Sequence, residues 1–120
     1  MHRLGLALSV LFLASCDDAP PAATLTEIPA AFRGNWDVAG DCGAGGPSAV
    51  VVTSREVRFS DSKIEVTGVA PDGETAARVD GRFTSADAQW DGAVRLELAN
   101  GGEELNVVNG SALHPRVKCP

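Results

Sequence analysis

The chain has 120 residues, 16 acidic and 10 basic side chains, and a formal net charge of −6. An acidic surface argues against nucleic-acid binding and against electrostatic docking on anionic lipid, because both require clustered lysine and arginine. Tyrosine is absent and tryptophan occurs only at positions 36 and 90, so stacking surfaces for bases or sugars are scarce.

The first sixteen residues follow the order of an export signal. His2 and Arg3 precede an apolar run from Leu4 to Leu13, and small residues follow the run. A basic head, a short apolar core and small residues before a cleavage point are typical of a secreted chain. The run is too short for a transmembrane helix, which needs about 20 apolar residues.

The tetrapeptide Leu13-Ala14-Ser15-Cys16 resembles the lipobox of bacterial lipoproteins at all four positions. The resemblance implies cleavage before Cys16 and a diacylglycerol and palmitate-type lipid anchor on that cysteine. Two or more acyl chains hold a protein stably on a membrane, so the mature protein is expected on the bacterial cell envelope, facing the periplasm. An ordinary secretory signal cleaved near Ala14 or Ser15 is the alternative. Asp17 resembles the aspartate that retains lipoproteins of enteric bacteria in the inner membrane. This resemblance favours the inner membrane over the outer one.

This interpretation divides the chain into a signal peptide over 1–15, a lipidated cysteine with a flexible tether over 16–29, and a single domain over 30–120. The tether contains three prolines and many small residues, which favour an extended spacer over a packed core. Removal of residues 1–15 takes away one basic residue and no acid. The remaining 105 residues carry 9 basic and 16 acidic side chains, a net charge of −7, and their length suits one domain.

The cysteines predict a disulfide. Lipidation of Cys16 leaves Cys42 and Cys119 as the only thiols in an oxidising compartment. Two cysteines allow one intramolecular pairing, so a Cys42–Cys119 bridge is expected. A metal pair is the minor alternative, but tetrahedral zinc requires four nitrogen or sulfur donors and His114 is the one histidine left. We expect no metal site.

From residue 30 onward, apolar and polar residues alternate with period two, which is typical of strands with one buried face. Glycines at 68, 81 and 92 lie inside such runs, where glycine often permits a bend. The alternating runs are 56–60, 63–67, 77–83, 90–98 and 104–107, and Leu113 and Val117 share one parity near the end.

Turn-forming residues separate the runs, and only Pro29–Phe32 indicates a short helical turn. Seven or eight short strands at this spacing predict an all-β fold, a small antiparallel up-and-down β-barrel. A closed barrel is favoured over an open sheet because it leaves no bare strand edge. The expected turns are 60–62, 71–73, 85–87, 100–102 and 109–110.

The expected first strand opens on Gly34-Asn35-Trp36, which resembles the Gly-x-Trp signature of the calycin barrels, the lipocalins and their relatives. A similar opening followed by a cysteine occurs in small periplasmic barrel inhibitors of proteases. The calycin resemblance implies that Trp36 closes one barrel end and that a basic residue of the last strand, here Arg116, packs over it as a cation–π pair. A core tryptophan without this role is the alternative.

Candidate catalytic residues are few, and we expect that the protein is not an enzyme. His114 is the only histidine after residue 15, and the pattern Gly-x-Ser-x-Gly is absent, so a serine–histidine–aspartate arrangement has little support. Paired carboxylates lie in expected turns or at outward positions, where solvated surface charge is the ordinary interpretation. No cofactor pattern is recognised. The arginines at outward positions predict cross-strand ion pairs and are Arg55, Arg58, Arg78, Arg82 and Arg95.

Two classes of function stay open. The first is a non-enzymatic binding or interaction module, for example an inhibitor, with an envelope protein as partner. The second is a carrier of a small apolar ligand inside the barrel. A filled core favours the first class, and a cavity above about 300 Å³ favours the second. The aromatic residues available to fill the core are Phe32, Trp36, Phe59, Phe83 and Trp90, and their number favours a filled core.

Overall fold

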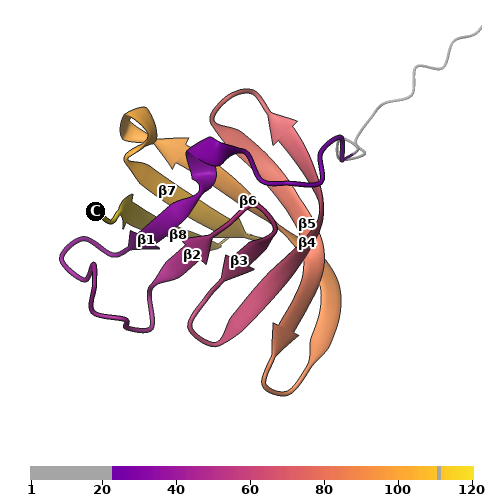
Figure 1. Cartoon of the computed structure of the whole chain (residues 1–120), viewed down its shortest axis with the longest axis horizontal. Helices are drawn as coiled ribbons and strands as arrows, with labels where there is room; N and C mark the ends of the chain where they lie inside the picture. The colour runs from indigo at the N-terminus through magenta and orange to yellow at the C-terminus, as the bar shows by residue number, and fades with distance from the viewer. Residues whose placement is uncertain (1–22, 111) are drawn as a thin grey trace, which may run out of the picture.

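Eight antiparallel strands close into a barrel in which each strand pairs with the next along the chain and the last pairs with the first (Figure 1). The computed structural model describes residues 23–110 and 112–120. Two short 3-10 helices, η1 (Ala30–Phe32) and η2 (Asn100–Gly102), accompany the strands. The predicted all-β up-and-down barrel is confirmed. The strands are β1 (Gly34–Asp37), β2 (Val50–Val52), β3 (Glu56–Arg58), β4 (Ser62–Asp72), β5 (Ala76–Ser85), β6 (Gln89–Ala99), β7 (Glu104–Asn109) and β8 (Ala112–Lys118).

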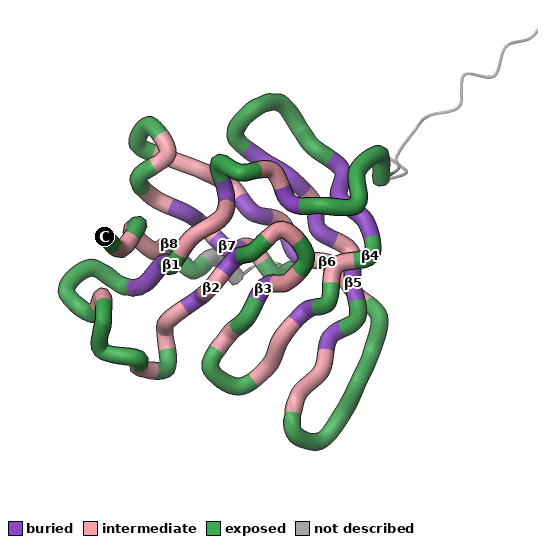
Figure 2. Tube along the Cα trace, in the orientation of Figure 1, coloured by how far each residue is buried: buried purple, intermediate pink, exposed green. Residues whose placement is uncertain are grey.

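The period-two pattern of the sequence reappears as alternating burial along the strands, visible as changing colours along the tube in Figure 2. The turns lie at or close to the predicted positions, although Pro71 and Asp72 still belong to β4 and the following turn spans 73–75. Gly73 and Gly110 adopt positive φ values of 74° and 66° that glycine tolerates best. Strand β2 was not predicted, because its three valines form a uniform run without alternation. Val50 and Val52 are buried in the core, while Val51 is half-buried.

The long strands β4, β5 and β6 bend at a pair of glycines. Gly81 of β5 and Gly92 of β6 are direct partners, and the β4–β5 register shifts close by, between Val66 and Gly68. A Cβ atom on Gly81 would overlap the carbonyl oxygen of Glu65. Glycine therefore permits the close approach of two backbones that this bend of the closing sheet requires.

Two residues that precede β1 and one residue of β1 itself fill one end of the barrel. Ile28, Phe32 and Trp36 are almost fully buried and belong to the same core as the inward residues of the strands. The Trp36 Nε1–H donates to the carbonyl oxygen of Phe32 at 3.0 Å, so the only polar atom of the indole is satisfied inside the core. This end of the barrel is therefore filled with side chains.

Part of the expected tether belongs to the folded domain. Leu25 forms an antiparallel bridge with Val69 of β4, and the Ile28 amide donates to the carbonyl oxygen of Ser54 at 2.8 Å. The Glu27 carboxylate lies 3.4 Å from Arg55. Figure 1 shows this segment crossing the barrel from η1 toward β4 and β5. The domain thus begins several residues before the expected boundary near residue 30, because Ile28 contributes a buried apolar side chain. Prolines and small residues around Ile28 hid this role in the sequence pattern.

Candidate ligand-binding site at the open end of the barrel

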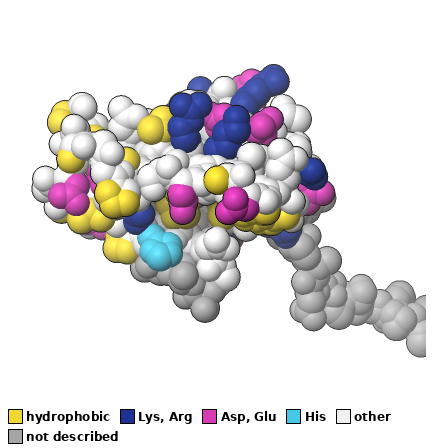
Figure 3. Space-filling model, turned by 90° about the horizontal axis from the view of Figure 1, so that it is seen from below, with side chains coloured by type: hydrophobic (Ala, Val, Ile, Leu, Met, Phe, Trp, Pro, Cys, Tyr) yellow, Lys and Arg dark blue, Asp and Glu magenta, His cyan; other side chains and the backbone are white. Residues whose placement is uncertain are grey.

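A hollow of about 520 Å³ opens at the end of the barrel opposite η1, where the β3–β4 turn and the loop over 38–49 lie. Pro47 of that loop and Ser60–Ser62 of the turn form part of its rim. Figure 3 looks onto the molecule from this side and shows hydrophobic side chains among charged ones. The barrel interior is therefore filled at one end and hollow at the other.

Two stacked aromatic rings form one wall of the hollow. Phe83 of β5 and Trp90 of β6 are direct partners in register, with ring centres 5.3 Å apart and ring planes 24° from parallel. A Cβ atom on Gly92 would lie 3.1 Å from the Phe83 ring, so the glycine leaves space for this stack. Trp90 remains 44% exposed. An exposed tryptophan beside a hollow is a common sign of a binding surface.

The apolar lining continues along neighbouring strands. Phe59, which follows β3, Val94 of β6 and Val107 of β7 all border the hollow. The sequence placed Phe59, Phe83 and Trp90 among the residues that fill the core. Phe83 does belong to the buried core and Phe59 packs against it, and both also border the hollow, whereas Trp90 is 44% exposed and lies outside the core.

Strand β8 brings basic side chains to the interior of the barrel. His114 is the register partner of the inward-facing Val107, and Arg116 is the partner of the fully buried Leu105. Antiparallel partners share one face of a sheet, so both basic residues face inward, and both border the hollow. The alternation of apolar residues predicted the opposite, with Leu113 and Val117 on the inward side of this strand. Val117 instead pairs with Glu104 on the other face.

The basic residue over Trp36 is Lys118, which corrects the expected role of Arg116. The Lys118 ammonium nitrogen lies 5.6 Å from the centre of the Trp36 ring, and the two residues are register partners between β8 and β1. Gly34, the first residue of the Gly-x-Trp motif, lies beside the Lys118 side chain, and a Cβ atom on Gly34 would lie 3.6 Å from Cε of Lys118. Arg116 lies two residues before Lys118 on the same side of β8, nearer the hollow.

Arg116 is held by a short chain of hydrogen bonds. Its Nε–H donates to the carbonyl oxygen of Ser48 at 2.6 Å. The Ser48 hydroxyl donates to the Asp37 carboxylate at 2.5 Å, and the Val38 amide donates to the same oxygen at 2.8 Å. Asp37 is only 2% exposed. A buried carboxylate at the end of β1 thus fixes the loop residue that positions Arg116.

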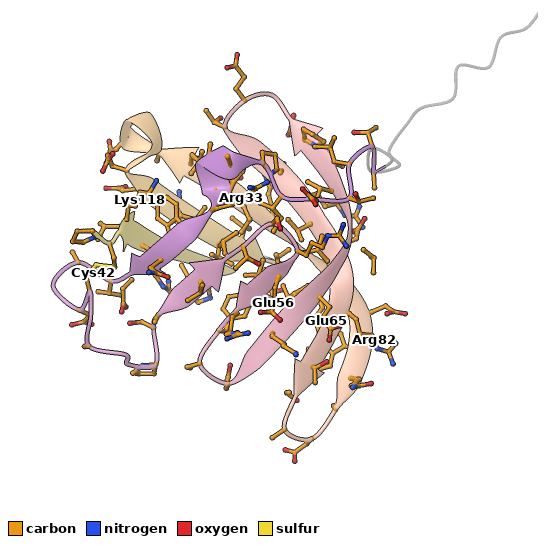
Figure 4. The ribbon with its side chains drawn as sticks, in the orientation of Figure 1. Arg33, Cys42, Glu56, Glu65, Arg82 and Lys118 are labelled. Atoms are coloured by element: carbon orange, nitrogen blue, oxygen red, sulfur yellow. A yellow bond between two sulfur atoms is a disulfide. The ribbon has the colours of Figure 1, made fainter. Side chains whose placement is uncertain are left out.

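The disulfide ties the same loop to the end of β8. Cys42 and Cys119 are bonded, with their Cα atoms 5.5 Å apart, as the sequence predicted. Figure 4 shows Cys42 and Lys118 at the edge of the barrel near the C-terminus. The Cys119 amide also donates to the carbonyl oxygen of Asn35 at 2.8 Å. The loop beside the hollow is therefore anchored both covalently and by the Asp37–Ser48–Arg116 contacts.

Arg116 and Lys118 differ from the other cations of residues 23–110 and 112–120. Each of the other seven lysines and arginines has a carboxylate oxygen within 4.0 Å, whereas these two have none. Arg95 is the most strongly paired, and hydrogen bonds to Glu97 and Asp72 raise its pKa. The paired residues are Arg33, Arg55, Arg58, Lys63, Arg78, Arg82 and Arg95.

Ion pairs on the outside of the barrel follow the expected pattern in part. Arg82 and Asp91 pair across β5 and β6 at 3.2 Å, whereas Arg58 pairs with Glu56 on its own strand at 2.7 Å. Figure 4 shows Glu56, Glu65 and Arg82 spread over the outer face of the sheet. Such exposed pairs contribute little to stability, and they leave no cluster of unpaired arginines there to hold an anion.

Several expectations concern other chemistry. Lipidation of Cys16 lies outside the described residues, and so does Ser111, the serine nearest to His114 in the sequence. His114 is exposed at the mouth of the hollow. Over 23–110 and 112–120, no group of three or more histidine, cysteine or acidic side chains is placed to hold a metal ion. The same ranges contain no helix long and apolar enough to span a membrane.

Comparisons with known proteins add no family. No protein-family model, curated protein or solved structure matches this chain. The geometry of the barrel and of its hollow therefore provides the evidence on function.

Two features of the sequence indicated the hollow, but the search for alternating strands did not use them. Gly92 interrupts the inward side of β6 between Trp90 and Val94, and an inward glycine often marks a place where another group approaches the backbone closely, as the Phe83 ring does here. On the last strand, His114 and Arg116 occupy alternate positions. Their shared parity already indicated that one face of this strand is basic.

Proposed function

We propose that the barrel is a non-enzymatic module that binds a small molecule with an apolar body in the hollow at its open end. The observation that carries the proposal is the hollow itself. Its volume of about 520 Å³ lies within the usual range of roughly 300–1,000 Å³ for ligand pockets. Stacked Phe83 and Trp90 provide an apolar wall. The carrier alternative is thus better supported than a barrel with a filled interior.

The attachment to the envelope is part of the same proposal. The lipobox supports acylation of Cys16, and the Cys42–Cys119 bridge is compatible with an oxidising compartment. Mass spectrometry of protein purified from a bacterial envelope should find a mature N-terminus at an acylated Cys16, and Cys16→Ala should abolish acylation. A mature chain that begins at any other residue would contradict the lipid anchor and leave the barrel proposal intact.

The binding experiment uses residues 16–120 with Cys16→Ser, which keeps every described residue and removes the acylation site. Neutral 2-naphthamide is titrated while the indole N–H of Trp90 and the amides of Val94 and Val107 are followed by NMR. We expect saturable shifts at these positions. Trp90→Ala should weaken binding at least fivefold because it removes half of the aromatic stack.

Leu25→Ala is the matched control for that titration. Leu25 is also an exposed large apolar residue, at 40%, but it lies on the segment before η1 and does not border the hollow. Its substitution should leave the affinity unchanged. Absence of saturable shifts in the parent chain would refute a ligand site in the hollow.

A second candidate, docking of an envelope protein on the same end, is favoured by the exposure of Trp90. Exposed tryptophan is enriched at protein interfaces. Affinity capture from the native envelope with the parent chain and with Trp90→Ala distinguishes the two. Loss of one defined partner in the variant, together with no binding of naphthamide, would favour the protein-docking function.

A further inference from the structure

We infer that the ligand carries an anionic group, most simply a carboxylate on a short aromatic body, and that Arg116 binds this group. The inference rests on the proposed function, because it assigns chemistry to the same hollow. It starts from an asymmetry of the walls: β5 and β6 contribute stacked aromatic rings, whereas β8 contributes two basic side chains.

Arg116 has unused hydrogen-bond donors. A guanidinium group has five N–H donors in a planar fork, and the fork matches a carboxylate with two parallel hydrogen bonds. The Nε–H of Arg116 is used by the carbonyl oxygen of Ser48, and the Nη1 contact with the carbonyl oxygen of Pro115 is long, at 3.4 Å. Among the described residues, Nη2 has no hydrogen-bond acceptor, so one edge of the group remains available to a ligand.

The charges around the hollow also favour an anion. Nearly every other described cation is neutralised by a carboxylate on the outer surface, but Arg116 faces inward without one. His114 borders the same hollow, and Asp61 on the exposed β3–β4 turn is the one acidic residue of its lining. The Asp37–Ser48 contacts hold Arg116 in place before a ligand arrives, which reduces the entropy that binding must offset.

The filled end of the barrel limits the length of the apolar body. Val79, Leu96 and Leu105 are fully buried in the core, next to Phe32 and Trp36. A long acyl chain would have to displace this core, because close-packed interiors contain few voids larger than water. A compact ring system against Phe83 and Trp90 needs no such displacement. We therefore favour a short aromatic acid over a fatty acid.

The test compares two ligands of nearly equal shape, 2-naphthoate and neutral 2-naphthamide, on residues 16–120 with Cys16→Ser. The parent chain should bind the carboxylate at least tenfold more tightly than the amide. Arg116→Gln should abolish this preference while the affinity for the amide changes less than threefold. Arg116→Lys should keep part of the preference, because it retains the charge and loses the planar fork.

Arg58→Gln is the matched control, since Arg58 pairs with Glu56 on the outside of the barrel, and it should leave the preference unchanged. Equal binding of both ligands by the parent chain would overturn the anion inference and leave the proposed function standing. Binding of neither ligand would overturn both. Retained binding of the amide by Arg116→Gln shows that the variant is folded, and a carboxylate preference that survives in it would refute the role of Arg116.

Discussion

Arg116 and Lys118 are two residues apart on the same side of β8 and meet different surroundings. The Lys118 ammonium lies over the buried ring of Trp36 at the filled end, where an aromatic face stabilises a cation. Arg116 reaches the carbonyl oxygen of Ser48 beside the hollow. The first contact stabilises the closure of the barrel, whereas the second fixes a guanidinium group beside the hollow.

Asp37 is the residue on which the orientation of Arg116 depends, and Asp37→Ala tests this dependence. The substitution removes the acceptor of Ser48 and of the Val38 amide, and an unsatisfied buried group costs about 1–3 kcal/mol. We expect the free energy of unfolding in urea to fall by about that amount. Asp41→Ala, at an exposed position of the same loop, should change it by less than about 0.5 kcal/mol. Equal effects of the two substitutions would show that Asp37 does not hold the loop.

At the level of strands and turns, local chemistry predicted most of the fold. Alternation located β4 to β7, and residues such as Gly73 and Gly110 located the turns. Strand β2, Val50–Val52, was not predicted because a short run of valines has no period. The burial of Ile28 was also not predicted, because a single apolar residue among prolines and small residues forms no periodic pattern.

The candidate site could be predicted only in its parts. Its aromatic and basic residues stand out in the sequence, but their convergence depends on the register of β8 against β7 and β1. A shift of one residue would have turned Arg116 outward and Val117 inward. The pairing of β8 with β7 follows from the short turn between Asn109 and Ala112, whereas the pairing of Trp36 with Lys118 joins residues that are distant in the sequence. Local patterns contain no information on such contacts.

For the whole molecule, the disulfide is expected to dominate stability. Cys42 and Cys119 are separated by 77 positions, and the chain-entropy model assigns about 4.5 kcal/mol to a loop of this size. Domains of this length have a total stability of about 5–15 kcal/mol. The double substitution Cys42→Ser and Cys119→Ser should therefore lower the melting temperature of residues 16–120 with Cys16→Ser by more than about 10 °C. Calorimetry of the two chains at equal concentration provides the measurement, and a change of only a few degrees would mean that the native strand pairing alone supports the barrel.

The bridge also converts the chain from residue 42 to residue 119 into a covalent ring that contains all of β2 to β8. A protease that cuts once at an exposed turn, such as the one between β4 and β5 or between β5 and β6, opens this ring without releasing a fragment. The two new ends stay joined through the sulfur atoms, and the interstrand hydrogen bonds keep them side by side. A nicked barrel can thus persist in a compartment rich in proteases, and its two pieces separate only when the bridge is reduced and the strands unfold.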